Sequence, residues 1–166
     1  MSAPYRIENL GGGHDRAAFA CGVEALDRYL KTQAGQDIRR RVANCFVAVP
    51  SDGKTIAGFY TLAAASIPLA ELPPEQARKL PRYPILPAAL IGRLAVDSRH
   101  AGRSLGSALL FDAMERAAKA APAIFAILVD AKDEDAARFY RRFGFQTFAS
   151  RPLTLFLPIA TALKVL

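Results

Sequence analysis

A strand, a loop of small residues and a helix follow one another in the middle of the chain, and this order constrains the fold most. Ala88 to Val96 reads as a buried strand, and a helix begins at Leu105. In the loop between them, Gly102 lets the backbone approach a ligand closely. The first turn of the helix adds unpaired N–H groups and a positive dipole end, and Arg103 adds a charge. The segment therefore favours a pyrophosphate site.

Two common phosphate motifs are excluded at this loop. No Gly-Lys-Ser/Thr triplet follows it, so it is not a Walker loop. The strand lies late in the chain and the glycine spacing is wrong for a dinucleotide fingerprint. On this segment alone, a plain tight turn at Gly102 and Gly106 remains an open alternative.

The remaining elements alternate between strands and helices, which predicts an α/β or α+β domain. We expect a helix from about Val23 and another that Asp133 caps and Gly144 ends, running to about Phe143. Residues 66–87 contain six prolines and read as a long loop, with one or two helical turns at 75–80. The other expected strands cover residues 5–10, 45–49, 55–64, 123–129, 145–148 and 153–157.

Composition predicts one globular domain over residues 1–166, because just over half of the residues are apolar. No apolar run reaches about eighteen residues, so no transmembrane helix is expected, and the first residues lack the apolar core of a signal peptide. Cys21 and Cys45 provide neither a disulfide framework nor a metal-ligand cluster. We expect a cytoplasmic, reduced protein without a metal.

The charge balance favours a polyanionic partner. The net charge is +7, with 22 Lys and Arg against 15 Asp and Glu. Ordinary surface charge in a basic protein is the equally weighted alternative. Basic residues gather in three places, which are Arg39 to Arg41, the group Arg78, Lys79 and Arg82, and the group Arg138, Arg141, Arg142 and Arg151.

Two segments resemble the motifs of a known enzyme superfamily. Arg99 to Leu110 resembles motif A of the GNAT superfamily of N-acetyltransferases, Gln/Arg-x-x-Gly-x-Gly/Ala. The motif falls on Ala101, Ser104 and Gly106, and the first two depart from it. Ser104 still provides an N–H and adds a hydroxyl, so phosphate binding is kept if its φ is negative. Ala137 to Phe145 resembles motif B, Ala-x-x-Phe-Tyr-x-x-x-Gly-Phe.

The chain also resembles, along nearly its whole length, the acetyltransferase toxins of bacterial type II toxin–antitoxin modules. The resemblance implies an α+β GNAT fold, with a central, mixed but mostly antiparallel sheet of six to seven strands and about four flanking helices. It also implies acetyl transfer from acetyl-CoA to the α-amine of aminoacyl-tRNA, which stops translation. The implied partner is a ribbon-helix-helix antitoxin, and a homodimer is in keeping with related toxins. The matching segments are Phe19 to Leu30, Gly58 to Leu62, Pro84 to Pro87, Leu90 to Asp97, the Tyr140 segment and Leu153 to Leu157.

The resemblance assigns roles to residues. Tyr140 is the expected general acid for the departing thiolate, although a phenol of pKa near 10 needs help from its surroundings to protonate a thiolate. A packed Tyr140 with a hydrogen-bonded hydroxyl is the structural alternative. Acetyl-CoA contacts are expected at Leu94, Ala95, Val96, Ala101, Gly102, Arg103, Ser104, Leu105, Gly106, Ser107 and Phe139, and tRNA contacts at Arg39, Arg40, Arg41, Arg93, Arg141 and Arg142.

Further chemistry follows from the acceptor. An aminoacyl α-amine is partly neutral near pH 7, so a strong general base is not required, and a backbone N–H around Leu94 to Val96 can hold the oxyanion. His100 is expected to be a solvent-exposed loop histidine, with a base or a phosphate contact as alternatives. Asp97 and Asp130 are expected to be structural or capping groups, and Cys21 a packed side chain.

Two other functions remain open. One is an acetyltransferase for a small-molecule or protein amine. The other is a nucleic-acid or protein-binding module with a vestigial CoA site, which the departures at Ala101 and Ser104 keep open.

Overall fold

The computed structural model describes residues 4–164 and 166, and its strands form one sheet in the order β1-β2-β3-β4-β5-β7-β6. The pairs β1–β2, β2–β3, β5–β7 and β6–β7 are antiparallel, and β4–β5 is parallel. The sheet is therefore mixed and mostly antiparallel, which confirms the expected α+β class. The strands are β1 (Arg6–Asn9), β2 (Asn44–Val49), β3 (Gly58–Pro68), β4 (Ile85–Val96), β5 (Ala126–Asp130), β6 (Gln146–Phe148) and β7 (Arg151–Pro158).

Six α-helices lie in the described part of the chain, where the resemblance implied about four. The two additional ones, α3 and α6, have four residues each. Two short 3-10 helices, η1 (Leu69–Glu71) and η2 (Ser98–His100), complete the elements. The α-helices are α1 (Glu24–Thr32), α2 (Ala34–Arg39), α3 (Pro74–Ala77), α4 (Leu105–Ala118), α5 (Glu134–Arg141) and α6 (Ile159–Ala162).

The chain divides into two compact units. The first contains the residues up to 63 together with 92–113, and the second contains 64–91 together with 114 to the end. The elements β3, β4 and α4 contribute residues to both units.

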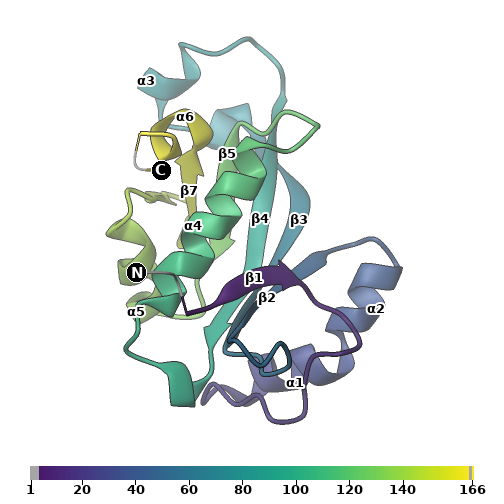
Figure 1. The fold of residues 1–166 in the computed structure, drawn as a ribbon. Coiled ribbons are helices and arrows are strands. Elements are labelled where there is room, and N and C mark those ends of the chain that lie inside the picture. The colour runs from purple at the N-terminus through teal and green to yellow at the C-terminus, as the bar shows by residue number, and fades with distance from the viewer. Residues whose placement is uncertain (1–3, 165) are drawn as a thin grey trace. The chain divides into compact units, whose positions relative to one another are not determined.

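The core of the first unit lies between the helices α1 and α2 and the strands β2 and β3 (Figure 1). Leu30 and Ala34 are fully buried there, together with Val47. Burying such apolar side chains stabilises the unit by about 1.5–3 kcal/mol for each large residue. At Gly58, a Cβ atom would lie 3.0 Å from the backbone oxygen of Ala95, so a larger residue would crowd this close approach.

The core of the second unit is built on β5, which pairs with β4 and β7. Ala126, Leu128 and Phe156 pack there. The carboxylate of Asp133 accepts the backbone N–H of Ala136 at 2.8 Å and caps α5, as predicted. Gly144 follows that helix with a φ of 97°, the left-handed conformation that glycine tolerates best.

Most expected elements are confirmed, with shifted ends. The strand expected at 55–64 begins later, at Gly58, and extends to Pro68. The proline-rich loop is therefore shorter than predicted, and a hydrogen bond from the Leu69 N–H to the Pro84 oxygen closes it at 3.0 Å. Its predicted helical turn is α3. The helices α2 and α6 were not predicted, because both are too short to show a helical period.

Candidate functional site

The carboxyl end of β4 extends beyond its pairing with β5. The parallel register runs from Ala88 opposite Ala126 to Ile91 opposite Val129, whereas β4 continues to Val96. In this extension Ala95 is buried, and Leu94 and Val96 are half-buried. The three residues expected to meet acetyl-CoA through their backbone therefore lie on a strand segment outside the β4–β5 register.

The loop after β4 contains two residues in the left-handed conformation. Gly102 has a φ of 80° and Ser104 a φ of 59°. The condition of a negative φ, under which phosphate binding at Ser104 is expected from the sequence, is therefore not met. Ser104 thus adopts the left-handed conformation that glycine tolerates best. A non-glycine residue pays about 1–2 kcal/mol for this conformation.

The helix α4 begins directly after this loop and presents its positive end there. The first intrahelical bond joins the Ala108 N–H to the Ser104 oxygen at 3.2 Å, so the N–H groups of Leu105, Gly106 and Ser107 precede the helical ladder. Leu105 is buried and anchors the turn, whereas the four preceding residues, Ala101 to Ser104, are exposed. This arrangement suits a pyrophosphate group.

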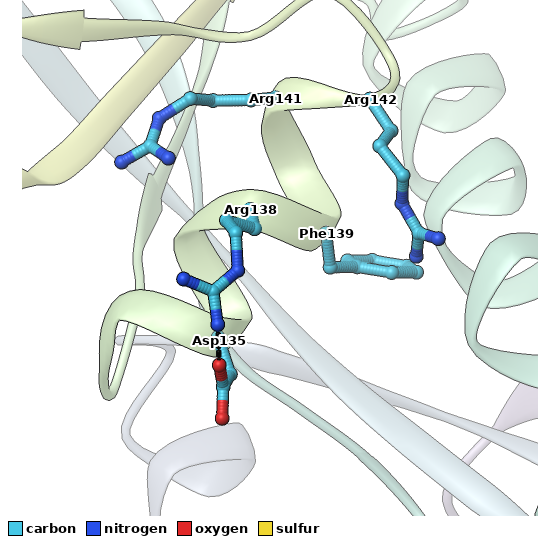
Figure 2. A pocket seen from close by; sticks show the side chains of 5 residues that line it. All are labelled: Asp135, Arg138, Phe139, Arg141 and Arg142. Atoms are coloured by element: carbon cyan, nitrogen blue, oxygen red, sulfur yellow. Dashed lines mark hydrogen bonds and ion pairs between the residues drawn. The ribbon is translucent and has the colours of Figure 1, made fainter.

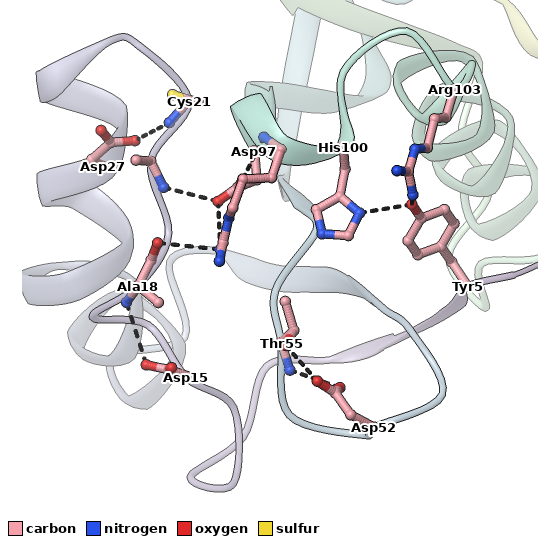
Figure 3. A network of polar contacts seen from close by, with 12 residues as sticks. Tyr5, Asp15, Ala18, Cys21, Asp27, Asp52, Thr55, Asp97, His100 and Arg103 are labelled. Carbon is pink, nitrogen blue, oxygen red and sulfur yellow. Dashed lines mark hydrogen bonds and ion pairs between the residues drawn. The ribbon is translucent and has the colours of Figure 1, made fainter.

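Tyr5, for which the sequence indicates no role, contacts the loop between β4 and α4. Tyr5 shares a hydrogen bond of 2.8 Å with Nδ1 of His100, and its hydroxyl accepts one of 3.3 Å from Arg103 (Figure 3). His100 is half-buried, so the expectation of a solvent-exposed loop histidine is wrong. No sequence pattern pointed to Tyr5, because its partners lie more than ninety residues away.

The carboxylate of Asp97 holds the start of the loop. It is fully buried and accepts the backbone N–H of Ala20 at 3.1 Å and that of Arg99 at 2.8 Å (Figure 3). The Arg99 Nε donates to it at 3.0 Å. Burial raises the pKa of Asp97, but these donors outweigh burial and the net pKa lies below its usual value. The predicted capping role is confirmed, and Asp130 likewise accepts a structural bond from Thr154 at 3.1 Å.

Cys21 is half-buried, and burial raises the pKa of its thiol, which does not favour a nucleophile. The described residues contain no group of three or more His, Cys, Asp or Glu side chains placed to hold a metal ion. Within the same residues, no helix is both long and apolar enough to cross a membrane.

Tyr140 lies on the buried face of α5. Its ring packs edge-to-face against Phe139 and Phe145, with centroids 5.1 and 5.5 Å away, and burial raises its pKa to about 12. Its hydroxyl forms no hydrogen bond within residues 4–164 and 166. No buried side-chain polar atom of that part lacks a partner, so this hydroxyl reaches solvent. A buried ring with an open hydroxyl is a suitable proton donor.

The exposed face of α5 lines an open pocket of about 610 Å³. Arg138 pairs with Asp135, whereas Arg142 reaches toward the Phe139 ring, 5.5 Å from its centroid (Figure 2). Arg141 points away from that ring and binds Glu134 at 2.8 Å.

The other arginines expected at tRNA differ in their surroundings. Arg93 is half-buried and stacks on the Tyr29 ring, 3.7 Å from its centroid. Arg39, Arg40 and Arg41 are exposed at the end of α2, and Arg41 has a φ of 61°. The structure thus brings Arg39 to Arg41 together in one turn and separates Arg141 from Arg142 by orientation.

The family model for the "Acetyltransferase (GNAT) domain" matches residues 41–147, which is well over half of the chain. The chain belongs to the GNAT acetyltransferase family. The match includes the loop of Gly102 to Gly106 and the whole of α5, the two segments in which the GNAT motifs were identified.

Two relatives within reach of sequence comparison are described as toxins. The chain is 40% identical, over 158 residues, to a "tRNA-acetylating toxin" of Mycobacterium tuberculosis, covering 94% of this chain and 91% of that protein. It is 36% identical, over 157 residues, to a "Probable toxin TacT" of Sinorhizobium fredii, covering 89% and 87%.

Solved structures of GNAT proteins share the fold. AtaT complexed with acetyl-methionyl-tRNAfMet superposes with a TM-score of 0.88 at 28% identity, covering 97% of this chain and 98% of that one. AtaTR bound with AcCoA superposes with a TM-score of 0.83 at 28% identity, and the match covers 98% of each chain. An AtaT mutant bound to the C-terminus of the antitoxin AtaR superposes with a TM-score of 0.82 at 25% identity, and the match again covers 98% of each chain.

Proposed function

We propose that this GNAT protein is a toxin that transfers the acetyl group of acetyl-CoA to the α-amine of aminoacyl-tRNA and thereby blocks translation. The relatives and the AtaT–tRNA complex support this acceptor by their names. The open hydroxyl of the buried Tyr140 is the observation on this chain that carries the proposal. We further propose that residues 1–166 act as one domain, in the cytoplasm, where aminoacyl-tRNA occurs.

The loop from Ala101 to Ser107, with Arg103 and the first N–H groups of α4, holds the pyrophosphate of acetyl-CoA in this proposal. Left-handed conformations such as those of Gly102 and Ser104 build anion-binding concavities from backbone N–H groups, and the loop that holds them is exposed, which supports this role. Leu94, Ala95 and Val96 pair with the pantetheine amides, and Phe139 contacts the same molecule. Bound acetyl-CoA supplies the activated acetyl thioester, and no metal takes part.

One backbone N–H of β4 between Leu94 and Val96 stabilises the oxyanion that forms when the amine attacks. Such a donor contributes about 3 kcal/mol in enzymes that use one. The acceptor amine is partly neutral near pH 7, so the protein supplies no strong base.

Tyr140 donates its phenolic proton to the departing sulfur atom. Its pKa of about 12 keeps the phenol protonated at neutral pH. A thiol has a pKa near 8.5, so complete transfer from the phenol alone is uphill by about 5 kcal/mol. The proton that the acetylated nitrogen loses returns to the phenolate, so the net transfer runs from the amine to the thiol and the enzyme is restored.

The tRNA is bound by Arg39, Arg40, Arg41, Arg93, Arg141 and Arg142 through its phosphates, which gives affinity and salt dependence rather than sequence choice. The hydrogen bond from Arg141 to Glu134 has to break for this role, whereas Arg142 has no carboxylate partner among the described residues.

The partner is an antitoxin of the ribbon-helix-helix type, and the active form is a homodimer. The complex of AtaT with the C-terminus of AtaR supports an antitoxin partner in general. Such a partner inhibits by covering the arginines or the acetyl-CoA site.

The proposal is tested by incubating the protein with labelled acetyl-CoA, charged total tRNA and a mixture of free amines, with deacylated tRNA as the control. We expect label in aminoacyl-tRNA and none in deacylated tRNA. Label confined to small amines or proteins would identify a different acetyltransferase, and failure to bind acetyl-CoA would identify a non-catalytic module.

A further inference from the structure

Four arginines without ion-pair partners gather around α2. Arg39, Arg40 and Arg41 come from the end of this helix, and Arg16 comes from the segment after β1. None of them forms an ion pair with a residue in 4–164 or 166. We call Arg16, Arg39, Arg40 and Arg41 the α2 arginine cluster.

Two guanidinium groups of the cluster share the space above one glycine. A Cβ atom on Gly35 would lie 3.3 Å from an Nη1 of Arg16 and 3.3 Å from an Nη1 of Arg39. The two positive groups are therefore separated by at most twice that distance. Like charges so close repel, and an anion placed between them would remove this repulsion. Gly35 leaves room for both groups, although glycine within a helix lowers stability.

The backbone of the cluster is also held in an unfavourable conformation. The Arg41 N–H donates to the Ile38 oxygen at 3.1 Å, and the Val42 N–H donates to the Asp37 oxygen at 3.0 Å. This pattern is a Schellman motif, whose left-handed position normally holds glycine. Here Arg41 occupies that position with a φ of 61°. Among the described residues only Arg41 and Ser104 combine a side chain with a positive φ.

The acidic side chain of α2 itself, Asp37, is already engaged. Asp37 accepts hydrogen bonds from the Tyr29 hydroxyl at 2.7 Å and from the Gln33 amide at 3.0 Å. Both donors are neutral, and each uses a different carboxylate oxygen. Asp37 thus forms no ion pair with an arginine of the cluster. Its pKa is lowered mainly by the Gln33 and Tyr29 hydrogen bonds, with a smaller attraction from Arg40.

Repulsion, a helical glycine and a left-handed arginine each lower stability, and they coincide at one surface of the first unit. Local rules of this kind are broken mainly at functional sites. We infer that the α2 arginine cluster binds phosphates of the RNA backbone, with Arg16 as an unassigned member and Arg41 as the residue for which backbone stability is given up. This inference rests on the proposed aminoacyl-tRNA acceptor.

The test compares Arg16→Gln and Arg41→Gly with wild type, and Arg28→Gln is the matched control. Arg28 is exposed on the neighbouring helix, but it is paired with Glu24 at 3.0 Å. The KM for aminoacyl-tRNA is measured over a range of salt concentrations, together with the KM for acetyl-CoA and the melting temperature.

We expect each cluster variant to raise the KM for aminoacyl-tRNA about tenfold and to reduce its salt slope by about one, with the KM for acetyl-CoA unchanged. Arg41→Gly keeps or raises the melting temperature, by up to about 4 °C, because glycine suits the left-handed position. The control changes neither KM. A higher KM for aminoacyl-tRNA at an unchanged or higher melting temperature would show that the variant affects RNA binding and not folding.

Two results would overturn the inference. One is an unchanged KM for aminoacyl-tRNA in both variants. The other is a rise in the KM for acetyl-CoA instead, which would assign the anion to CoA. If the wild-type protein acetylates no aminoacyl-tRNA at all, the proposed function fails instead, and that outcome is visible before any variant is compared.

Discussion

The guanidinium of Arg103 donates a hydrogen bond to the hydroxyl of Tyr5 at 3.3 Å, across 98 positions of the chain. The same hydroxyl meets Nδ1 of His100 at 2.8 Å, and the two rings pack edge-to-face (Figure 3). The segment before β1 therefore braces the loop in which pyrophosphate binding is proposed.

Replacing Tyr5 with Phe should weaken acetyl-CoA binding while leaving the chemistry intact. The variant keeps the ring but releases Arg103, and an exposed charged hydrogen bond of this kind contributes about 1 kcal/mol, or about fivefold in affinity. Steady-state kinetics should show a higher KM for acetyl-CoA at constant kcat. In a double-mutant cycle with Arg103→Ala, additive effects would show that the two residues do not act together.

Replacing Ser104 with Gly should leave the fold as stable or stabilise it by up to about 1 kcal/mol. Glycine removes the cost of the left-handed φ but loses more conformational entropy on folding. Ser104→Val should destabilise, because a β-branched residue tolerates this conformation poorly. Urea denaturation measures both variants, with acetyl-CoA affinity retained in Ser104→Gly. A loss of more than 1 kcal/mol in the glycine variant would argue against the observed φ.

Replacing Asp97 with Asn should destabilise the protein by about 2–4 kcal/mol at pH 7. The buried amide carries no negative charge to attract Arg99, and an NH₂ group takes the place of one acceptor oxygen. The folded pKa of Asp97 is lowered. Its contribution is therefore complete above the unfolded value near 3.8 and is lost as pH falls through the folded value. Urea titrations should find the difference between wild type and variant shrinking below about pH 4. A difference independent of pH would exclude this role of the charge.

The pH profile of acetyl transfer should rise and then stay level. Tyr140 keeps its proton up to a pKa of about 12, so it does not limit the rate at moderately alkaline pH. The rise follows deprotonation of the acceptor amine, whose ordinary pKa lies near 8 or, for an aminoacyl ester, lower. Rates with intact aminoacyl-tRNA, corrected for ester hydrolysis, should be level between about pH 8 and 10. A fall over that interval would mean that another group donates the proton.

The sequence was sufficient where local chemistry decides the structure. The cap of Asp133, the end of α5 at Gly144 and the hairpin of β6 and β7 all follow from nearby residues. Helix α2 was missed because Gly35 interrupts a helix of only six residues. The strand expected from Thr55 starts later because the Thr55 N–H and hydroxyl are bound to the Asp52 carboxylate in a turn.

The candidate site was harder to predict, because its side chains find their partners over long distances. The sequence does not show whether a basic side chain forms an ion pair with a carboxylate. Only the structure distinguishes Arg151, bound to Glu71 at 3.1 Å, from Arg16, which lies beside another arginine near Gly35. The positive φ of Ser104 was also hidden, since serine rarely adopts it.

In the proposed reaction Tyr140 is the acid that lets this GNAT protein acetylate aminoacyl-tRNA, and the variant Tyr140→Phe removes that acid. The single-turnover rate of label transfer from acetyl-CoA to purified aminoacyl-tRNA should be compared in wild type and variant, with acetyl-CoA affinity and melting temperature measured alongside. We expect transfer by the wild type and a rate lower by about 10²-fold or more in the variant, with acetyl-CoA affinity and melting temperature unchanged. A variant that transfers acetyl groups at nearly the wild-type rate would contradict it.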